Sequence, residues 1–95
     1  MINKEFIEQL KKYHSNNDYK SIIKESKIKL KEQPGSFFLC DILASTYGLL
    51  ENFYVAIEYY KRALEIKPDS YEVCCAIGIS YLKLDNHSEA ENYYL

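Results

Sequence analysis

An internal repeat of 34 residues is the feature that most constrains this chain. When the sequence is shifted by 34 positions, residues 37–61 align with residues 71–95. The identical pairs in this alignment are Cys40/Cys74, Tyr47/Tyr81, Leu50/Leu84, Asn52/Asn86, Ala56/Ala90, Tyr59/Tyr93 and Tyr60/Tyr94. Pro34 and Pro68 keep the same spacing. Such a period indicates an array of one supersecondary unit, because a single unit of this size cannot bury its apolar face alone.

Each repeat has the apolar spacing of two amphipathic helices. In the central repeat the apolar positions that follow helical spacing are Cys40, Leu43, Ala44 and Tyr47, and then Ala56, Tyr60 and Ala63. We expect Asn52 to cap the second helix by accepting a hydrogen bond from an amide that follows it. Pro34-Gly35-Ser36 and Pro68-Asp69-Ser70 separate the repeats, with Ser36 as a candidate cap and with Asp69 and Glu72 at capping-box spacing.

The first 36 residues keep the frame of the repeat although part of its sequence has changed. Phe6, Leu10 and Tyr13 predict a helix over 3–14, and a second helix is predicted over 18–32. Terminal repeats are often atypical because one of their faces meets water. The sequence therefore predicts six helices in one domain, in units of about 3–36, 37–70 and 71–95. The third unit stops after about two turns of its second helix, so we expect further repeats of a longer protein to follow.

The pattern resembles the tetratricopeptide repeat (TPR). The slots of that family read Cys40, Leu43, Ala44, Tyr47, Ala56, Tyr60, Ala63 and Pro68 in the central unit, and Cys74, Ile77, Gly78, Tyr81, Ala90 and Tyr94 in the third. The main departure is cysteine where the family usually has tryptophan. The resemblance implies an all-α fold of antiparallel helix-turn-helix repeats, stacked as a short right-handed α-solenoid, and a protein-protein interaction module rather than an enzyme.

The resemblance also implies a binding surface. In this family the first helix of each repeat lines a concave groove that holds a peptide or a partner's helix. The residues placed there are Ile7, Lys11, His14, Phe38, Asp41, Ile42, Ser45, Gly48, Glu72, Cys75, Ala76, Ile79 and Leu82. Gly48 is expected to lie in mid-helix and to face the groove, where glycine is less favourable than alanine. It indicates either a hollow beside Phe38, Asp41 and Ser45 or neutral drift of the sequence.

Some partners are disfavoured by the charges of the chain. Family members that clamp an acidic chaperone tail use basic residues, but the equivalent slots here are Ile7, Lys11, Ile42, Glu72 and Ala76. A net charge of −2, with both signs mixed along the helices, offers no field for nucleic acid or an anionic membrane. We therefore expect a protein or peptide partner. The alternative is a regulatory or targeting segment of a larger enzyme outside this chain.

Neither metal nor cofactor chemistry is indicated by the sequence. His14 and His87 lack companions at metal-ligand spacing, and no phosphate loop or nucleophile motif is present. The three cysteines form no disulfide framework, which favours a cytoplasmic protein. Cys74 and Cys75 suggest either a soft-metal site or core packing, and packing is favoured because consecutive helical side chains diverge by about 100°. We expect Cys40 and Cys74 in the core and Cys75 toward the groove.

Two further expectations concern the turns and the end of the chain. Asn17, Glu51 and Asp85 occupy a turn slot that is usually glycine in this family, so a left-handed backbone is predicted, with strain at Glu51. The shortened last helix is expected to leave an apolar seam at Ile77, Tyr81, Leu84, Tyr94 and Leu95. Such a seam would favour self-association through the C-terminal end.

Overall fold

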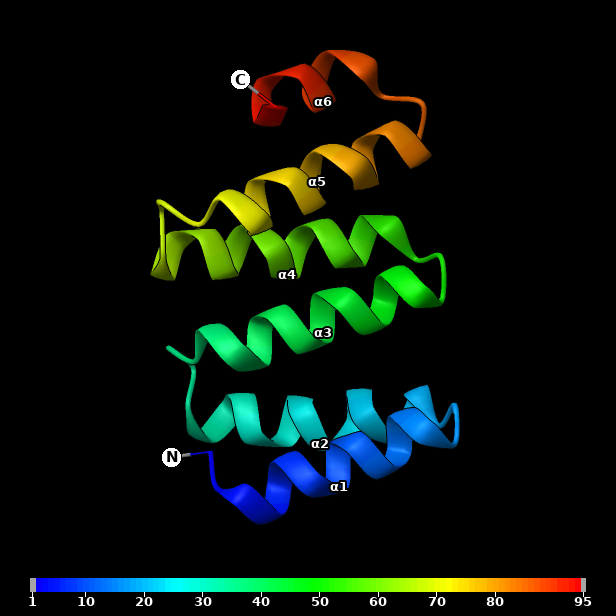
Figure 1. The fold of residues 1–95 in the computed structure, drawn as a ribbon. Coiled ribbons are helices and arrows are strands. Elements are labelled where there is room, and N and C mark those ends of the chain that lie inside the picture. The colour runs from blue at the N-terminus through cyan, green and yellow to red at the C-terminus, as the bar shows by residue number, and fades with distance from the viewer. Residues whose placement is uncertain (1, 95) are drawn as a thin grey trace.

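The structure, a computed structural model that describes residues 2–94, is a row of stacked α-helices (Figure 1). The helices are α1 (Lys4–Ser15), α2 (Tyr19–Glu32), α3 (Phe37–Leu49), α4 (Phe53–Ile66), α5 (Tyr71–Lys83) and α6 (His87–Tyr94). Each helix packs against the next along the chain, and the described residues contain no strand. The predicted all-α array of helix pairs is confirmed.

Short polar side chains start most of the helices. Asn3, Asp18 and Ser36 each accept a hydrogen bond from a backbone amide three residues later, as N-caps do. The predicted capping role of Asp69 is wrong, since the N-cap of α5 is Ser70, whose hydroxyl accepts from the Val73 amide. Asn52 precedes α4 but makes no side-chain cap hydrogen bond, in contrast to the prediction.

The core runs through the middle of the row. Its fully buried large side chains are Leu39 and Leu43 of α3 and Ile77 of α5, and Cys40, Ile57 and Ala63 belong to the same cluster. The first unit is packed differently, because Ser26 is fully buried at the slot held by Tyr60 in the central unit, and its hydroxyl lacks a hydrogen-bond partner. An unsatisfied buried hydroxyl costs about 1–3 kcal/mol.

A lysine and two tyrosines recur at each junction between units. The Lys27 ammonium lies 5.5 Å from the ring centre of Tyr47, and Lys61 lies 5.5 Å from that of Tyr81, 34 residues later. Each of these tyrosines stacks on a second one, Tyr59 or Tyr93, with ring centres 5.9 Å apart. The tyrosine contact raises the pKa of each lysine. The pairing of a cation with an aromatic ring therefore links the second helix of one unit to the next unit.

Helical i,i+4 spacing predicts the surface ion pairs Glu8–Lys12, Glu25–Lys29 and Glu58–Arg62, but none of the three forms among the described residues. Lys29 pairs with Glu32 at 3.5 Å, not with Glu25, and this is the one ion pair among the described residues. The guanidinium of Arg62 lies 5.6 Å from the Tyr59 ring centre and forms no ion pair with Glu58. Expected pairing of Glu8 with Lys12 is likewise absent from the described residues. Exposed ion pairs contribute little to the stability of a fold, so nearby aromatic rings compete with the carboxylates for the lysine and arginine side chains.

The left-handed turns are confirmed. Asn17, Glu51 and Asp85 have φ values of 57°, 61° and 58°. Each follows the first helix of a unit by the same number of residues, so one turn geometry is used three times. Asparagine and aspartate adopt this backbone more readily than glutamate, which places the greatest strain at Glu51.

Replacing Glu51 with glycine is expected to raise the free energy of unfolding by up to about 1 kcal/mol, because glycine removes the left-handed penalty. Asp85→Gly is the matched control and should gain less. Urea titration of the three proteins measures the difference. A less stable Glu51→Gly protein would contradict the prediction.

The predicted exposed seam at the C-terminal end is only partly present. Ile77 is fully buried within the core cluster, so the expectation that it borders an open seam is wrong. Tyr81 and Leu84 are half-buried and pack against the core, while Leu95 and the side chain of Tyr94 lie outside the described residues.

Self-association through this end remains a prediction. Sedimentation of the chain at tens of micromolar, beside a variant with Leu84→Glu, measures it. We expect an oligomer that the charge substitution dissociates. A monomer in both samples would rule the contact out.

Candidate functional site

A hollow of about 320 Å³ lies between α1 and α3, the first helices of two successive units. Its lining residues are Ile7, Leu10, Lys11 and His14 of α1, Ile22 of α2, and Phe38, Ile42, Ser45, Thr46 and Leu49 of α3. Most of this surface is apolar, and the exposed Lys11 and His14 provide its basic groups. We call this the first hollow.

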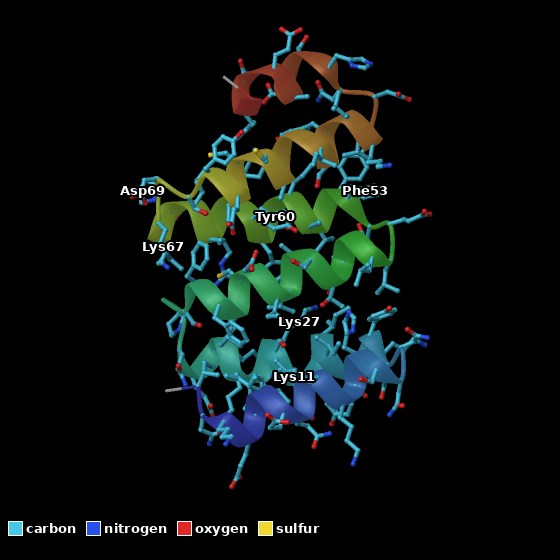
Figure 2. The ribbon with its side chains drawn as sticks, viewed as in Figure 1. Lys11, Lys27, Phe53, Tyr60, Lys67 and Asp69 are labelled. Carbon is cyan, nitrogen blue, oxygen red and sulfur yellow. The ribbon has the colours of Figure 1, made fainter. Side chains whose placement is uncertain are left out.

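A second hollow of about 390 Å³ lies between α3 and α5. Its lining residues are Ser45, Gly48 and Leu49 of α3, Phe53 and Tyr60 of α4, and Ala76, Ile79 and Ser80 of α5. Ser45 and Leu49 line both hollows, which therefore meet across α3. We call the two hollows together the groove; Figure 2 labels Lys11 on its α1 side and Phe53 and Tyr60 on its α4 side.

The predicted groove residues divide into two sets. Those that line a hollow are Ile7, Lys11, His14, Phe38, Ile42, Ser45, Gly48, Ala76 and Ile79. Those that line neither hollow are Asp41, Glu72, Cys75 and Leu82. Sequence reasoning missed Leu10, Ile22, Thr46, Leu49, Phe53, Tyr60 and Ser80. Several of these residues occupy or adjoin positions that the sequence assigned to the core. They line the groove as well because a shallow groove exposes one edge of such side chains.

Gly48 lies in the last turn of α3, so the expectation that it occupies mid-helix is wrong. A Cβ atom built on Gly48 would meet nothing within 4 Å, and its φ is not positive. Neither close approach nor backbone strain therefore requires glycine here. The absent side chain leaves open space in the second hollow beside Ser45, whereas Phe38 lines the first hollow and Asp41 lines neither.

A polar group of residues lies at the α3–α5 side of the groove. The Ser45 Oγ and the Tyr60 hydroxyl are 3.3 Å apart and form a hydrogen bond. Asp41 is half-buried, and burial, followed by the negative charge of Glu72, raises its pKa. Burial and the charge of Asp41 likewise raise the pKa of Tyr60, while the Ser45 hydrogen bond acts in the opposite direction. Asp41 therefore keeps its charge at a cost in stability.

The sign of this effect gives a pH-dependent prediction for Asp41→Asn. Because the pKa of Asp41 in the folded protein lies above the ordinary aspartate value of 3.8, its contribution to stability is least unfavourable below that pH and worsens as the pH rises through the folded pKa. We expect Asp41→Asn to be more stable at pH 7 by up to about 1 kcal/mol, a limit set by solvent screening of the half-exposed carboxylate. The gain should vanish near pH 3.

Urea titrations of both proteins across this pH range provide the measurement. Glu58→Gln, at an exposed position of α4, is the charge-matched control and should show no such trend. An Asp41→Asn protein that is less stable at neutral pH would overturn the prediction.

The three cysteines differ in burial. Cys40 is fully buried, and burial raises the pKa of its thiol. Cys74 is only half-buried, so its predicted core position is wrong in degree. Cys40 belongs to the core cluster, and Cys74 does not. Cys75 is half-buried and lines neither hollow.

We therefore expect a thiol reagent to label Cys74 and Cys75 at comparable rates and Cys40 far more slowly, because a buried neutral thiol reacts only after local opening. Peptide mapping by mass spectrometry after timed labelling gives the three rates. Labelling of Cys40 as fast as Cys75 would contradict the packing of α3.

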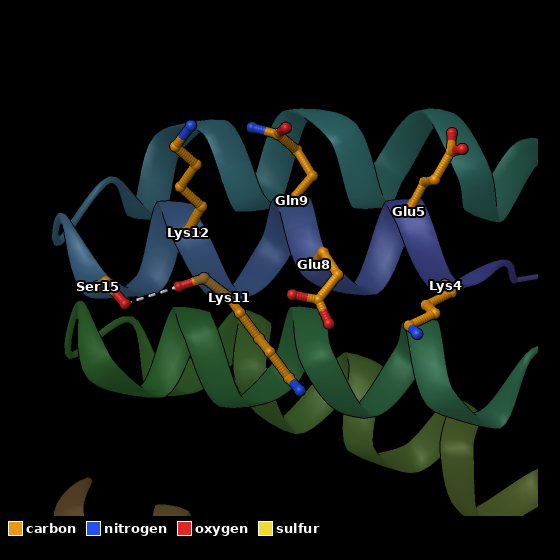
Figure 3. Close-up of a pocket in the computed structure, with 7 residues that line it drawn as sticks. All are labelled: Lys4, Glu5, Glu8, Gln9, Lys11, Lys12 and Ser15. Atoms are coloured by element: carbon orange, nitrogen blue, oxygen red, sulfur yellow. Dashed lines mark hydrogen bonds between the residues drawn. The ribbon is translucent and has the colours of Figure 1, made fainter.

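The other hollows are lined by charged side chains. One, of about 750 Å³, follows a single face of α1 at Lys4, Glu5, Glu8, Gln9, Lys11, Lys12 and Ser15 (Figure 3). In that view Lys4, Glu8 and Lys11 point to one side, and Glu5, Gln9 and Lys12 to the other. Another, of about 360 Å³, includes Lys27, Lys31 and Arg62 between α2 and α4. One helix face alone does not enclose a ligand, so the groove is the better candidate.

No cluster of three histidine, cysteine or acidic side chains suited to a metal occurs among the described residues. No helix within residues 2–94 combines the length and apolar character needed to cross a bilayer.

The family model for the tetratricopeptide repeat matches residues 39–70 and 71–95, which are the second and third helix pairs. The chain belongs to the tetratricopeptide repeat family. The TPR slots from which the resemblance was inferred lie within these matched residues. The first helix pair is outside the match, in keeping with its altered core at Ser26.

Solved structures of MamA have the same arrangement of helices. MamA AMB-1 in crystal form P212121 is 26% identical, with a TM-score of 0.81 over 86% of this chain and 45% of that one. The MamA D159K mutant is 25% identical, with a TM-score of 0.82 over 90% and 47% of the two chains. This TPR chain thus spans about half the length of these structures. No curated protein sequence matches it.

Proposed function

We propose that this TPR module binds a peptide or a helix of a partner protein in the groove. Membership of the family and the likeness to MamA support a protein-protein interaction module in general. The observation that supports groove binding is the meeting of two largely apolar hollows across α3, at Ser45 and Leu49. Together the hollows draw on all three predicted units, 3–36, 37–70 and 71–95, which we propose act as one domain.

The exposed apolar side chains of the groove supply the driving force. Leu49 is 55% exposed, Ile79 48% and Phe38 37%, although large apolar side chains of this kind are usually buried. Full burial of such a side chain stabilises a complex by about 1.5–3 kcal/mol before the entropy of association is subtracted. An amphipathic helix presents apolar side chains at the spacing that successive hollows require.

The charges of the groove support the earlier exclusion of an acidic chaperone tail. Lys11 and His14 are the basic residues that line the groove, where a clamp uses several, and Asp41 and Glu72, which lie outside the lining on α3 and α5, would repel a terminal carboxylate. We propose a non-enzymatic role without cofactor for this chain. The alternative, a regulatory or targeting segment of a larger enzyme, uses the same groove and differs only in what the complete protein carries.

Selection of random twelve-residue peptides displayed on phage tests the proposal. Ile79→Arg places a charge in the second hollow and should weaken selected peptides by about tenfold or more, as loss of an interface hot spot does. The matched control is Ile28→Arg on α2, since Ile28 is 49% exposed and lies outside both hollows. Equal loss of binding in the two variants, or no loss in either, would contradict groove binding.

A further inference from the structure

We infer that the groove selects a peptide that carries a lysine or arginine beside its apolar residues. The inference rests on the proposed function and names the chemistry of the partner at the same site. The cation would lie against Asp41 of α3 and Glu72 of α5. The apolar side chains of the same peptide would occupy the two hollows.

The geometry of α3 places Asp41 next to the hollows. Asp41, Ser45 and Gly48 are spaced i, i+4 and i+7, so they lie along one face of the helix. At 1.5 Å per residue, Asp41 is about 6 Å along the axis from Ser45, which lines both hollows, and about 10 Å from Gly48. A peptide that fills the hollows therefore extends over Asp41 within about one further helical turn.

The charge at this place is unbalanced. Among the described residues, Asp41 forms neither an ion pair nor a side-chain hydrogen bond, although it is half-buried. The charged group that acts on it is Glu72, which has the same sign. A partner's cation placed between the two carboxylates would relieve this repulsion and the burial cost together.

The neighbouring cations do not supply that charge. Arg62 lies over the Tyr59 ring, and Lys61 lies over the Tyr81 ring. Lys11 and His14 line the first hollow on α1, on the other side of α3 from α5. The groove is thus basic at its α1 side, and the carboxylates of Asp41 and Glu72 lie outside its lining, on α3 and α5. An acidic side chain of the partner is compatible with Lys11 and His14, and the lysine or arginine of the partner is compatible with Asp41 and Glu72.

The distance between Asp41 and Gly48 along α3 sets the spacing expected between the cation and the apolar residue of the partner. A distance of about 10 Å corresponds to seven residues in a helical peptide and to three in an extended one. A bulky apolar residue in the second hollow should therefore be accompanied by lysine or arginine at i±7 or i±3. This spacing can be read directly from selected sequences.

The test is selection of random twelve-residue peptides on the intact chain, followed by binding measurements with synthetic copies of the winners. We expect lysine or arginine to be enriched at one of these spacings. The double variant Asp41→Asn/Glu72→Gln should weaken those copies by about five- to tenfold, and added salt should have a similar effect. Glu58→Gln/Glu65→Gln, two exposed positions on α4, removes the same charge and should change the affinity less than twofold.

The outcomes separate the two proposals. Some selected peptides are expected to lose binding to the Ile79→Arg variant. If these peptides are not enriched in lysine or arginine, or if they bind the double variant as well as the original chain, the inference is overturned and groove binding still stands. Winners enriched in acidic residues also overturn the inference. Failure to select any peptide sensitive to Ile79→Arg overturns both. Because removing the Asp41 charge is expected to stabilise the fold, weaker binding by the double variant cannot be attributed to unfolding.

Discussion

Each helix pair in this chain depends on the next one for burial of its apolar face. Leu39 and Leu43 of α3 and Ile77 of α5 are fully buried in a single cluster that also includes Ile57 of α4. The recurring contacts of lysine with stacked tyrosines follow the same rule, since each lysine reaches the tyrosine of the following unit. Stability in such an array is the sum of neighbouring interfaces, and a change at one junction affects the units on both sides.

The groove follows from this stacking. Successive first helices α1, α3 and α5 are held at spacings that the helices between them set, and shallow hollows remain where side chains are short. Ser45 and Gly48 fill little space between α3 and its neighbours, and Ala76 has the same effect on α5. The second hollow therefore arises at the small residues of α3 and α5. The second helices supply the walls through Ile22, Phe53 and Tyr60.

The repeat made most of the fold predictable from the sequence, but less of the groove. Helical spacing and the 34-residue shift determine which face of each helix is buried, and the left-handed turn at Glu51 followed from the family slot it occupies. The errors involve contacts with a second element. Cys74 occupies the slot of Cys40 but is only half-buried, and Ile77 is fully buried in the core cluster instead of bordering an open seam. Tyr60 was assigned to the core, yet its hydroxyl reaches the groove to meet Ser45.

Asp41 shows why stability and binding need different residues in such a groove. A half-buried carboxylate beside another carboxylate raises the free energy of the isolated fold, and an amide of the same shape would avoid this effect. Packing offers no reason for the charge, since Asp41 makes no hydrogen bond within the described residues. In the complex that we propose, a cation of the partner would make this interaction favourable. In the proposed complex the energy lost in the free protein would be recovered on binding, so that the charge would contribute to selectivity as well as to affinity.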